Sequence, residues 1–356
     1  MQTAKKPGKI LGKVTAPSGV LILIDFGLMD LWTHEQPPMV PAGVLSEEAL
    51  AAANNGADFA IEGADALKAG KRFDKQPHPL FLYDIPRHTV DEIKESFASL
   101  ITKEGLNARL VELDQRVCPR KRVDQAVAHG VGAAEVFLHG IHAIAISGLP
   151  ANQPLSIEGR PMEEGPFAKH WRDISLIIKP DAMVAETKKV GHVAVDMGRL
   201  MFCDLDSMGE WQHQDTIDGL ADLVFWGKDA QRLATKFGAK HIDGSIYGVI
   251  NKPIDELAAL AFQVQKHLEL HHLVSAIDFR PHSDHWRMLK AVAECETESG
   301  DIELGESRCC GFMTSWGDGF FPIFLELDEH DAPVRLRIDL GTEETIRGMH
   351  MVNRFA

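Results

Sequence analysis

Hydrophobic and polar positions follow two periodicities along this chain. Apolar side chains recur at every second position of residues 321–327 and 334–339, which predicts two β-strands. Leu257, Leu260 and Val264 recur at helical spacing, which predicts an amphipathic helix. Similar patterns predict helices at about 46–70, 89–104, 218–237 and 254–270, and strands at 108–113 and 273–279.

The order of these elements repeats along the chain. Residues 12–34 align with 191–213 at a constant offset of 179, with eight of the 23 positions identical. A shorter connection then changes the offset to 164, at which Tyr83 meets Tyr247. The chain is therefore predicted to hold two tandem copies. They span residues 8–165 and 187–350, and the eight identical pairs are Gly12/Gly191, Val14/Val193, Gly19/Gly198, Leu21/Leu200, Asp25/Asp204, Met29/Met208, Trp32/Trp211 and His34/His213.

Each predicted copy begins with two short β-runs around a turn that contains glycine, at 17–19 and 196–198. Helices, an apolar strand and β-rich sequence follow in both copies. The expected fold class is α+β, with an internal tandem duplication that forms a pseudo-two-fold pair of α/β copies with antiparallel-rich sheets. The Pro- and Glu-rich stretch at 161–166 is predicted to be a linker or a surface loop.

Composition and charge exclude several classes of protein. The chain has 45% hydrophobic and 25% charged residues, as ordinary globular proteins do. Its 37 basic and 52 acidic residues give a formal charge of −15, and no basic stripe suited to nucleic acid is present. No stretch approaches the roughly 18 apolar residues that cross a bilayer, and no secretory signal is recognised. The five cysteines lack zinc spacing, which favours a reducing cytoplasm.

Two segments of the second copy carry a family resemblance. Residues 191–204 are similar to a pattern in which a Val-Asp-Ser-Gly turn precedes a strand that ends in Asp-Pro, and residues 315–324 are similar to a Gly-Asp-Gly-x-Tyr-Pro-Val segment. Together they resemble the uncharacterised bacterial family known as domain of unknown function 4241. This chain departs from the pattern at Met197, where serine is expected, and at Leu205, where proline is expected. The resemblance implies a fold and no reaction.

Residues kept in both copies are best explained by a shared requirement of the fold. Asp25 and Asp204 each end a predicted strand, and an aspartate there caps the following turn through its side-chain oxygen. His34 and His213 are matched as well. They form either a symmetric site or two packed, hydrogen-bonded histidines.

The copies diverge just after a matched Asp-x-Arg motif, which is Asp278-Phe-Arg280 in the second copy. Ion pairing on one strand face explains that motif without chemistry. The second copy then has His282, Asp284 and His285 where the first has cysteine, arginine and lysine. Imidazoles beside carboxylates suit general acid–base catalysis or binding of a divalent, zinc-like or iron-like ion. Solvated loop histidines are the alternative.

The leading hypothesis gives these residues roles in one pocket, in or beside the second copy. Asp278, His282 and His285 are the predicted catalytic residues. His282, Asp284 and His285 are also the predicted metal ligands. Arg280 is predicted to bind an anionic group of the substrate.

A glycine-flanked aspartate, in Trp316-Gly-Asp318-Gly, offers a further candidate. Trp316 and Asp318 either form a pocket wall that binds substrate or belong to a tight hairpin turn in which the aspartate caps backbone amides.

Several enzyme classes lack their motifs in this chain, including Rossmann dehydrogenases, P-loop enzymes, α/β-hydrolases and His-Glu-x-x-His metalloproteases. The predicted function is hydrolysis or a related acid–base reaction on a small polar substrate in the cytoplasm. The alternative is a non-catalytic binding or immunity-type protein that engages a basic protein partner through its acidic surface. Neither nucleic acid nor a membrane is an expected partner.

Overall fold

The chain folds into two compact units, which are described separately. The main unit combines Met1–Gly209 with Thr297–Ala356, and the inserted unit is Glu210–Glu296. Both are α+β with antiparallel sheets. Among the described helices, none is long and apolar enough to span a membrane. The computed structural model describes residues 8–31, 57–73, 79–83, 90–113, 119–129, 132–138, 141–163 and 165–352.

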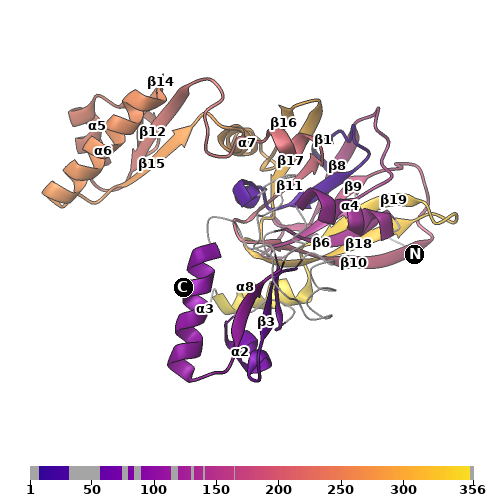
Figure 1. Ribbon diagram of the computed structural model, residues 1–356. Coiled ribbons are helices and arrows are strands. Elements are labelled where there is room, and N and C mark those ends of the chain that lie inside the picture. The colour runs from indigo at the N-terminus through magenta and orange to yellow at the C-terminus, as the bar shows by residue number, and fades with distance from the viewer. Residues whose placement is uncertain are drawn as a thin grey trace. The chain divides into compact units, whose positions relative to one another are not determined.

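Two six-stranded antiparallel sheets contain the core of the main unit (Figure 1). Sheet A has the strand order β1-β8-β9-β19-β18-β10, and sheet B has the order β16-β17-β11-β2-β7-β6. The strands of sheet A are β1 (Lys9–Val14), β8 (Leu155–Pro161), β9 (Trp171–Ile177), β19 (Pro333–Asp339), β18 (Gly319–Leu327) and β10 (Glu186–Val195). Those of sheet B are β16 (Ser299–Leu304), β17 (Ser307–Met313), β11 (Arg199–Asp204), β2 (Leu21–Ile24), β7 (Ile141–Ile146) and β6 (Ala133–Leu138).

Alternation of side chains decides which face of sheet A is buried. In β19, Val334, Leu336 and Ile338 are buried, and Arg335 and Arg337 point to the other face because successive strand residues alternate. The buried face packs against sheet B in one hydrophobic core. The two C-terminal strands predicted from this alternation are confirmed as β18 and β19.

The strand order of both sheets is symmetric about a central pair. In sheet A, β1-β8-β9 from the first half of the chain meets β19-β18-β10 from the second half at β9/β19. In sheet B, β2-β7-β6 and β11-β17-β16 meet at β2/β11. Each half of the chain therefore supplies three neighbouring strands to each sheet.

The opening strands of the two halves carry a β-bulge at matching places. The register of β1 against β8 shifts between Ile10 and Gly12, and that of β10 against β18 shifts between Lys189 and Gly191. Gly12 and Gly191 are separated by the 179 residues of the sequence offset. The repeat seen in the sequence therefore coincides with a repeated backbone irregularity.

A carboxylate faces each of these two glycines. Asp301 accepts a hydrogen bond from the backbone N–H of the residue after Gly12, at 3.2 Å, and Glu135 accepts one from the residue after Gly191, at 3.0 Å. A Cβ atom at either glycine would collide with the facing carboxylate. Glycine is therefore required at both positions by the close approach of an acidic side chain.

The predicted capping by the two strand-terminal aspartates is confirmed. Both carboxylates are completely buried. Asp25 accepts a hydrogen bond from the N–H of Gly27 at 2.8 Å. Asp204 accepts hydrogen bonds from the N–H groups of Asp206 and Ser207 at 3.0 and 3.3 Å. Each aspartate therefore fixes the turn that leaves its own strand.

Each of these aspartates also holds the turn between the two opening strands of the other half of the chain. Asp25 accepts hydrogen bonds from the N–H groups of Asp196 and Met197, at 2.9 and 2.8 Å. Asp204 accepts hydrogen bonds from the N–H and the hydroxyl of Ser18, at 2.9 and 2.7 Å. Two buried carboxylates therefore connect the β1–β2 and β10–β11 turns to the opposite half.

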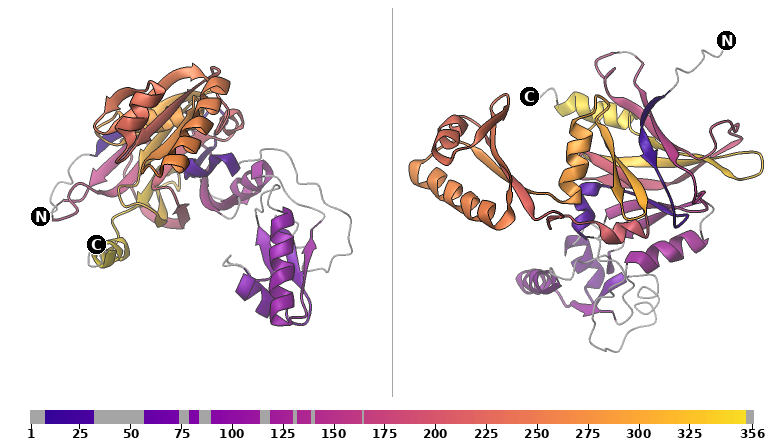
Figure 2. Two further views of the ribbon diagram at one scale, coloured as in Figure 1. Left: turned by 90° about the vertical axis from the view of Figure 1, so that its left-hand side faces the viewer. Right: turned by 90° about the horizontal axis from the view of Figure 1, so that it is seen from above.

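The inserted unit is a four-stranded antiparallel sheet, sheet D, with two helices on one face (Figures 1 and 2). Ala221, Leu223 and Phe225 of the sheet pack against α5 and α6. The sheet has the order β13 (Lys240–Asp243), β14 (Ile246–Pro253), β12 (Leu220–Trp226) and β15 (Ala276–Pro281), and the helices are α5 (Ala230–Phe237), α6 (Ile254–His271) and α7 (Asp284–Ala293).

The first half of the chain contains a smaller, three-stranded antiparallel sheet, sheet C. Ile61 of its central strand packs with Ala69 and Phe97 of two helices. The sheet has the order β4 (Phe81–Tyr83), β3 (Ala57–Glu62) and β5 (Arg109–Glu112), and the helices are α2 (Ala66–Phe73) and α3 (Val90–Glu104). Among the described residues, the other elements are η1 (Phe26–Leu31), α4 (Pro119–His129) and α8 (Glu343–Val352) of the main unit, and η3 (Ser207–Glu210) at its boundary with the inserted unit.

Two of the predicted helices include a segment that is a strand instead. Residues 46–56 lie outside the described residues. In the described parts of the segments predicted at 46–70 and 218–237, the strands β3 and β12 precede the helices α2 and α5. In each segment a glycine with positive φ, Gly63 at +122° and Gly227 at +116°, separates strand from helix. The apolar residues of β12 are two apart, a spacing that buries one face of a strand. The predicted helices at 89–104 and 254–270 are confirmed as α3 and α6.

The predicted linker at 161–166 lies between two strands of sheet A, with Pro161 as the last residue of β8 and residues 162–163 and 165–166 described before β9. It joins the antiparallel neighbours β8 and β9. The strand β9 lies after residue 165, where the first copy was predicted to end. The two compact units do not coincide with the two predicted copies. Glu210–Glu296, which lies inside the predicted second copy at 187–350, forms a unit of its own.

Candidate functional site

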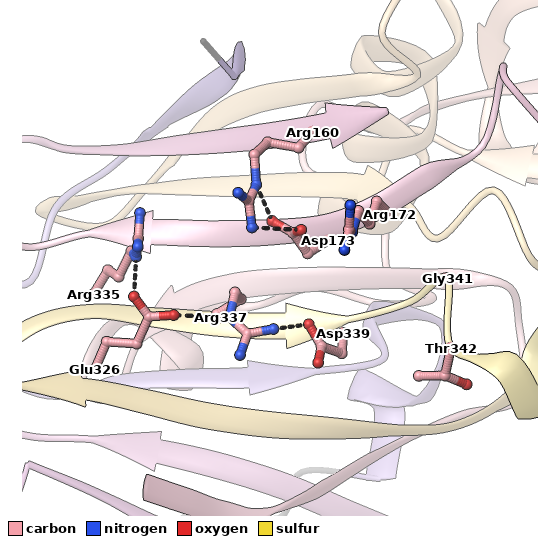
Figure 3. A pocket seen from close by; sticks show the side chains of 9 residues that line it. All are labelled: Arg160, Arg172, Asp173, Glu326, Arg335, Arg337, Asp339, Gly341 and Thr342. Carbon is pink, nitrogen blue, oxygen red and sulfur yellow. Dashed lines mark hydrogen bonds and ion pairs between the residues drawn. The ribbon is translucent and has the colours of Figure 1, made fainter. Parts of the chain in front are cut away.

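A polar cavity of about 310 Å³ lies on the outer face of sheet A, where the two halves of the chain meet (Figure 3). Its volume is at the lower end of the range for small-molecule sites. Four arginines and three acidic residues supply most of the lining, which gives a formal charge of +1. The lining residues are Arg160, Arg172, Asp173, Glu326, Arg335, Arg337, Asp339, Gly341 and Thr342.

Two cross-strand ion pairs frame the cavity with their charges in reversed order. Arg160 of β8 lies opposite Asp173 of β9 and binds it through Nε and Nη2, at 2.8 and 2.7 Å. Glu326 of β18 lies opposite Arg335 of β19 and accepts a hydrogen bond from its Nε. The arginine is therefore on the outer strand in the first half and on the inner strand in the second half.

The second pair extends into a chain of ion pairs (Figure 3). Arg337 donates through Nε to Glu326 at 2.8 Å and through Nη1 to Asp339. Glu326 is 5% exposed, and burial by itself would raise the pKa of its carboxyl. Hydrogen bonds from Arg337 and Arg335 outweigh burial and lower that pKa below its usual value. The carboxylate therefore stays ionised and keeps both guanidinium groups in place.

Like charges meet at the central strand pair. Asp173 of β9 lies directly opposite Asp339 of β19, an arrangement that is unfavourable unless it is neutralised. Arg160 neutralises Asp173, and Arg337 neutralises Asp339. The ion pairs are therefore part of what allows the two halves to meet at this point.

Arg172 gives the cavity lining its net positive charge, because the other three arginines are balanced by three acidic residues. Its side chain is exposed, and within the described residues it forms no ion pair. Its carbonyl accepts hydrogen bonds from the N–H groups of Leu340 and Gly341, at 3.0 and 2.9 Å, which fixes the backbone beside the cavity. The cavity therefore has one guanidinium whose charge is not matched by an acidic neighbour.

Sequence reasoning did not single out these arginines. The segment 334–339 was interpreted only as a strand, although its outward positions are Arg335, Arg337 and Asp339 rather than neutral polar residues. Three charged residues on one strand face are the signal that was available. Both arginines pair with Glu326 of β18, and the other charged lining residues come from β8 and β9, which the sequence does not align with β19.

The structure places the predicted residues Asp278 and Arg280 on one face of β15. Arg280 Nε donates to Asp278 Oδ2 at 2.9 Å, as expected for ion pairing within a strand. The Arg280 guanidinium also lies over the Trp286 ring, 4.9 Å from its centroid. Both charged groups are thus engaged with neighbours in the inserted unit.

His282 lies between two carboxylates. Its Nδ1 is 2.8 Å from Asp218 and its Nε2 is 3.2 Å from Asp222. Desolvation by itself would lower the pKa of His282, but the hydrogen bonds to Asp218 and Asp222 outweigh it and raise the pKa above the ordinary value of 6.5. The same hydrogen bond lowers the pKa of Asp218. A substrate could exchange a proton with this imidazole only after one of these hydrogen bonds opens.

We expect the His282 imidazole to remain protonated above pH 6.5, measured by an NMR titration of its ring signals. Because its pKa is raised, the imidazolium stabilises the fold below the unfolded-state value, and that stabilisation is lost as pH rises through the folded-state pKa. Asp222→Asn should lower the pKa, whereas Asp215→Asn, at an exposed position in the same unit, should leave it unchanged. A pKa at or below 6.5 in the unaltered protein would contradict the proposed pairing.

Asp284 and His285 are buried at the start of α7. Asp284 accepts hydrogen bonds from the N–H of Gln212 at 3.0 Å and from Arg287 at 2.7 Å. The His285 ring stacks on that of His213, with centroids 4.2 Å apart. His34, the predicted counterpart of His213, lies outside the described residues.

The predicted metal centre is not supported by this geometry. Among the described residues, no group of three His, Cys, Asp or Glu side chains is placed to hold a metal ion. His282 is directed to Asp218 and Asp222, while Asp284 binds the backbone and Arg287. The three proposed ligands are therefore engaged with different partners.

Trp316 and Asp318 belong to the main unit rather than to the inserted unit. Trp316 is 5% exposed, and its Nε1 donates to the carbonyl of Trp171 at 2.6 Å. Asp318 is exposed in the connection between β17 and β18, where Gly317 has φ of +76°. This connection is not a hairpin turn, because β17 belongs to sheet B and β18 to sheet A. The indole belongs to the hydrophobic core.

The chain was also compared with known proteins. No family model, curated protein or solved structure matches it.

Proposed function

We propose that the chain arose by tandem duplication and that its two copies complete each other's sheets as a pseudo-two-fold pair. Four repeated features support this proposal: the symmetric strand orders, the matched bulges, the acidic residues facing Gly12 and Gly191, and the exchanged capping by Asp25 and Asp204. The glycines at the bulges and the capping aspartates share the 179-residue offset of the sequence. Unrelated segments would not be expected to share all of them.

We propose further that the protein binds a small anionic molecule in the cavity on sheet A. The observation that carries this proposal is the set of four arginines around a 310 Å³ cavity, with Arg172 outside the ion-pair network. Guanidinium groups bind carboxylates and phosphates through two parallel hydrogen bonds. Arg160 and Arg335 use only some of their N–H groups in the ion pairs, so further donors exist beside Arg172.

The net charge of the cavity lining has the opposite sign to that of the whole chain. The protein carries a formal charge of −15, and a long-range attraction for anions is therefore not expected. The cavity lining is +1 within this acidic molecule. An anionic ligand would be selected by short-range hydrogen bonds from arginine.

The test is calorimetric titration of the full chain with inorganic phosphate, malonate and citrate. We expect at least one of these anions to bind, and Arg172→Ala to weaken it about tenfold or more, since a hydrogen bond to a charged group contributes about 1.5–3 kcal/mol. The affinity should fall as ionic strength rises. Arg232→Ala is the matched control, because Arg232 is 70% exposed on α5 of the inserted unit. The proposal fails if none of the three anions binds, or if Arg172→Ala binds as tightly as the control.

Acid–base catalysis in the inserted unit is a second candidate. The observation that favours it is the partly exposed His282 imidazole between Asp218 and Asp222, with the paired Asp278 and Arg280 on the strand that leads to it. Such a group could deliver a proton to a small polar substrate in hydrolysis. Once a substrate is found by screening esters and phosphoesters, His282→Ala should abolish turnover. Unchanged turnover would remove this assignment.

A further inference from the structure

Two buried cysteines of sheet B lie in contact across neighbouring strands. In the antiparallel register of β11 and β17, Phe202 is paired with Cys310, so Cys203 lies directly opposite Cys309. Their Sγ atoms are 3.0 Å apart, and neither residue is exposed.

We propose that Cys203 and Cys309 form an oxidation site at which a peroxide joins β11 to β17 through a disulfide. Directly opposed residues of an antiparallel pair have Cβ atoms about 4.5–5.5 Å apart, and a disulfide needs about 3.5–4.5 Å, so closure requires a shift of about 1 Å. Cys310 follows Cys309 but points to the other face of sheet B, into the core shared with sheet A. The strand register therefore places Cys309, and not the adjacent Cys310, beside Cys203.

The chemistry balances with hydrogen peroxide as the oxidant. One thiolate attacks the peroxide oxygen, the O–O bond breaks, and a sulfenic acid forms with the loss of one water molecule. The second thiolate then attacks the sulfenic sulfur, forms the S–S bond and releases a second water molecule. Two thiols are oxidised by two electrons in total, and the peroxide is reduced to water. Because both thiols are buried, peroxide must enter during local opening, so this reaction is expected to be slower than oxidation of the exposed Cys295.

The position of the pair gives the cross-link a structural consequence. Cys203 and Cys309 are 106 residues apart in the sequence, and the segment between them contains the whole inserted unit. A disulfide would close this segment, which also contains β16 of sheet B, into a ring. It would restrict the unfolded chain without changing the strand pairing, and would therefore stabilise the main unit.

The experiment uses the full chain in the absence of denaturant. The protein is treated with hydrogen peroxide, the peroxide is removed with catalase, and remaining thiols are alkylated after denaturation. Digestion without reductant and mass spectrometry then locate the disulfides. We expect a Cys203 peptide joined to the Cys309 peptide with the loss of two hydrogen atoms, and fragmentation between Cys309 and Cys310 identifies the linked sulfur. The oxidised protein should have a higher thermal midpoint, which dithiothreitol reverses.

Serine variants of the two adjacent buried cysteines, Cys309 and Cys310, show which of them forms the disulfide with Cys203. Cys310→Ser should keep the cross-link, and Cys309→Ser should lose it together with the rise in thermal midpoint. If Cys309→Ser fails to fold, the peptide linked to Cys203 in the oxidised, unaltered protein still shows whether Cys309 or Cys310 is the partner. The proposal is overturned if Cys203 and Cys309 both remain alkylatable after Cys295 has been oxidised, or if Cys310 is the main partner of Cys203.

Discussion

We expect Asp204→Ala to lower the free energy of unfolding by about 3–5 kcal/mol, measured by urea denaturation. The Asp204 carboxylate is fully buried and accepts four hydrogen bonds. Two of these come from Ser18 in the other half of the chain, and two from the N–H groups of Asp206 and Ser207. Alanine would leave all four donors without their acceptor, and partly buried N–H groups are costly to leave unpaired.

The sequence of the turn around Ser18 explains why a side-chain hydroxyl, rather than a second backbone N–H, donates to Asp204. At the matching turn, Asp25 binds the backbone N–H groups of both Asp196 and Met197. In the first half, Pro17 occupies the place of Asp196 and has no N–H. The Ser18 hydroxyl supplies the second donor to Asp204 instead.

Asp196→Ala is the matched control for this prediction. Asp196 is exposed and contributes its backbone, not its carboxylate, to the turn. Its substitution should change the free energy of unfolding by less than about 0.5 kcal/mol. An Asp204→Ala variant as stable as Asp196→Ala would show that the exchanged capping contributes little.

Separating the chain into residues 1–183 and 184–356 should leave neither half able to form its part of sheets A and B by itself. Alone, the first half would lose the β9/β19 and β2/β11 pairings and expose two sheet edges. It would also lose half of the hydrophobic core, to which both halves contribute buried side chains. Co-expressed halves should associate, because each provides the strands that the other lacks.

Circular dichroism and size-exclusion chromatography check this expectation. A complementary version starts from the folded full chain, with a protease site inserted between Met183 and Val184, both exposed in the connection from β9 to β10. After cleavage, the two fragments should elute together in native buffer and separate in urea. A cooperative unfolding transition of the first half alone would contradict the expectation that each half needs the strands of the other.

Local pattern determined a large part of the secondary structure. Alternating apolar residues predict β18 and β19 because a strand with one buried face needs an apolar side chain at every second position. Helical spacing predicts α3 and α6 for the equivalent reason. At 218–237 the same reasoning failed, because closely spaced apolar residues fit both a strand and a helix until Gly227 and the pairing of β12 with β14 and β15 separate them.

Sequence by itself determined the α+β class, the internal offset of 179 residues and the capping role of Asp25 and Asp204. Only the tertiary structure decided which charged residues share a cavity. Arg160 and Arg335 are far apart in the chain, and they meet because β9 pairs with β19 in one register. It also assigned Asp278 and Trp316 to different units. The physical reason is that periodicity reports which face of an element is buried, whereas pairing between distant strands decides which exposed faces become neighbours.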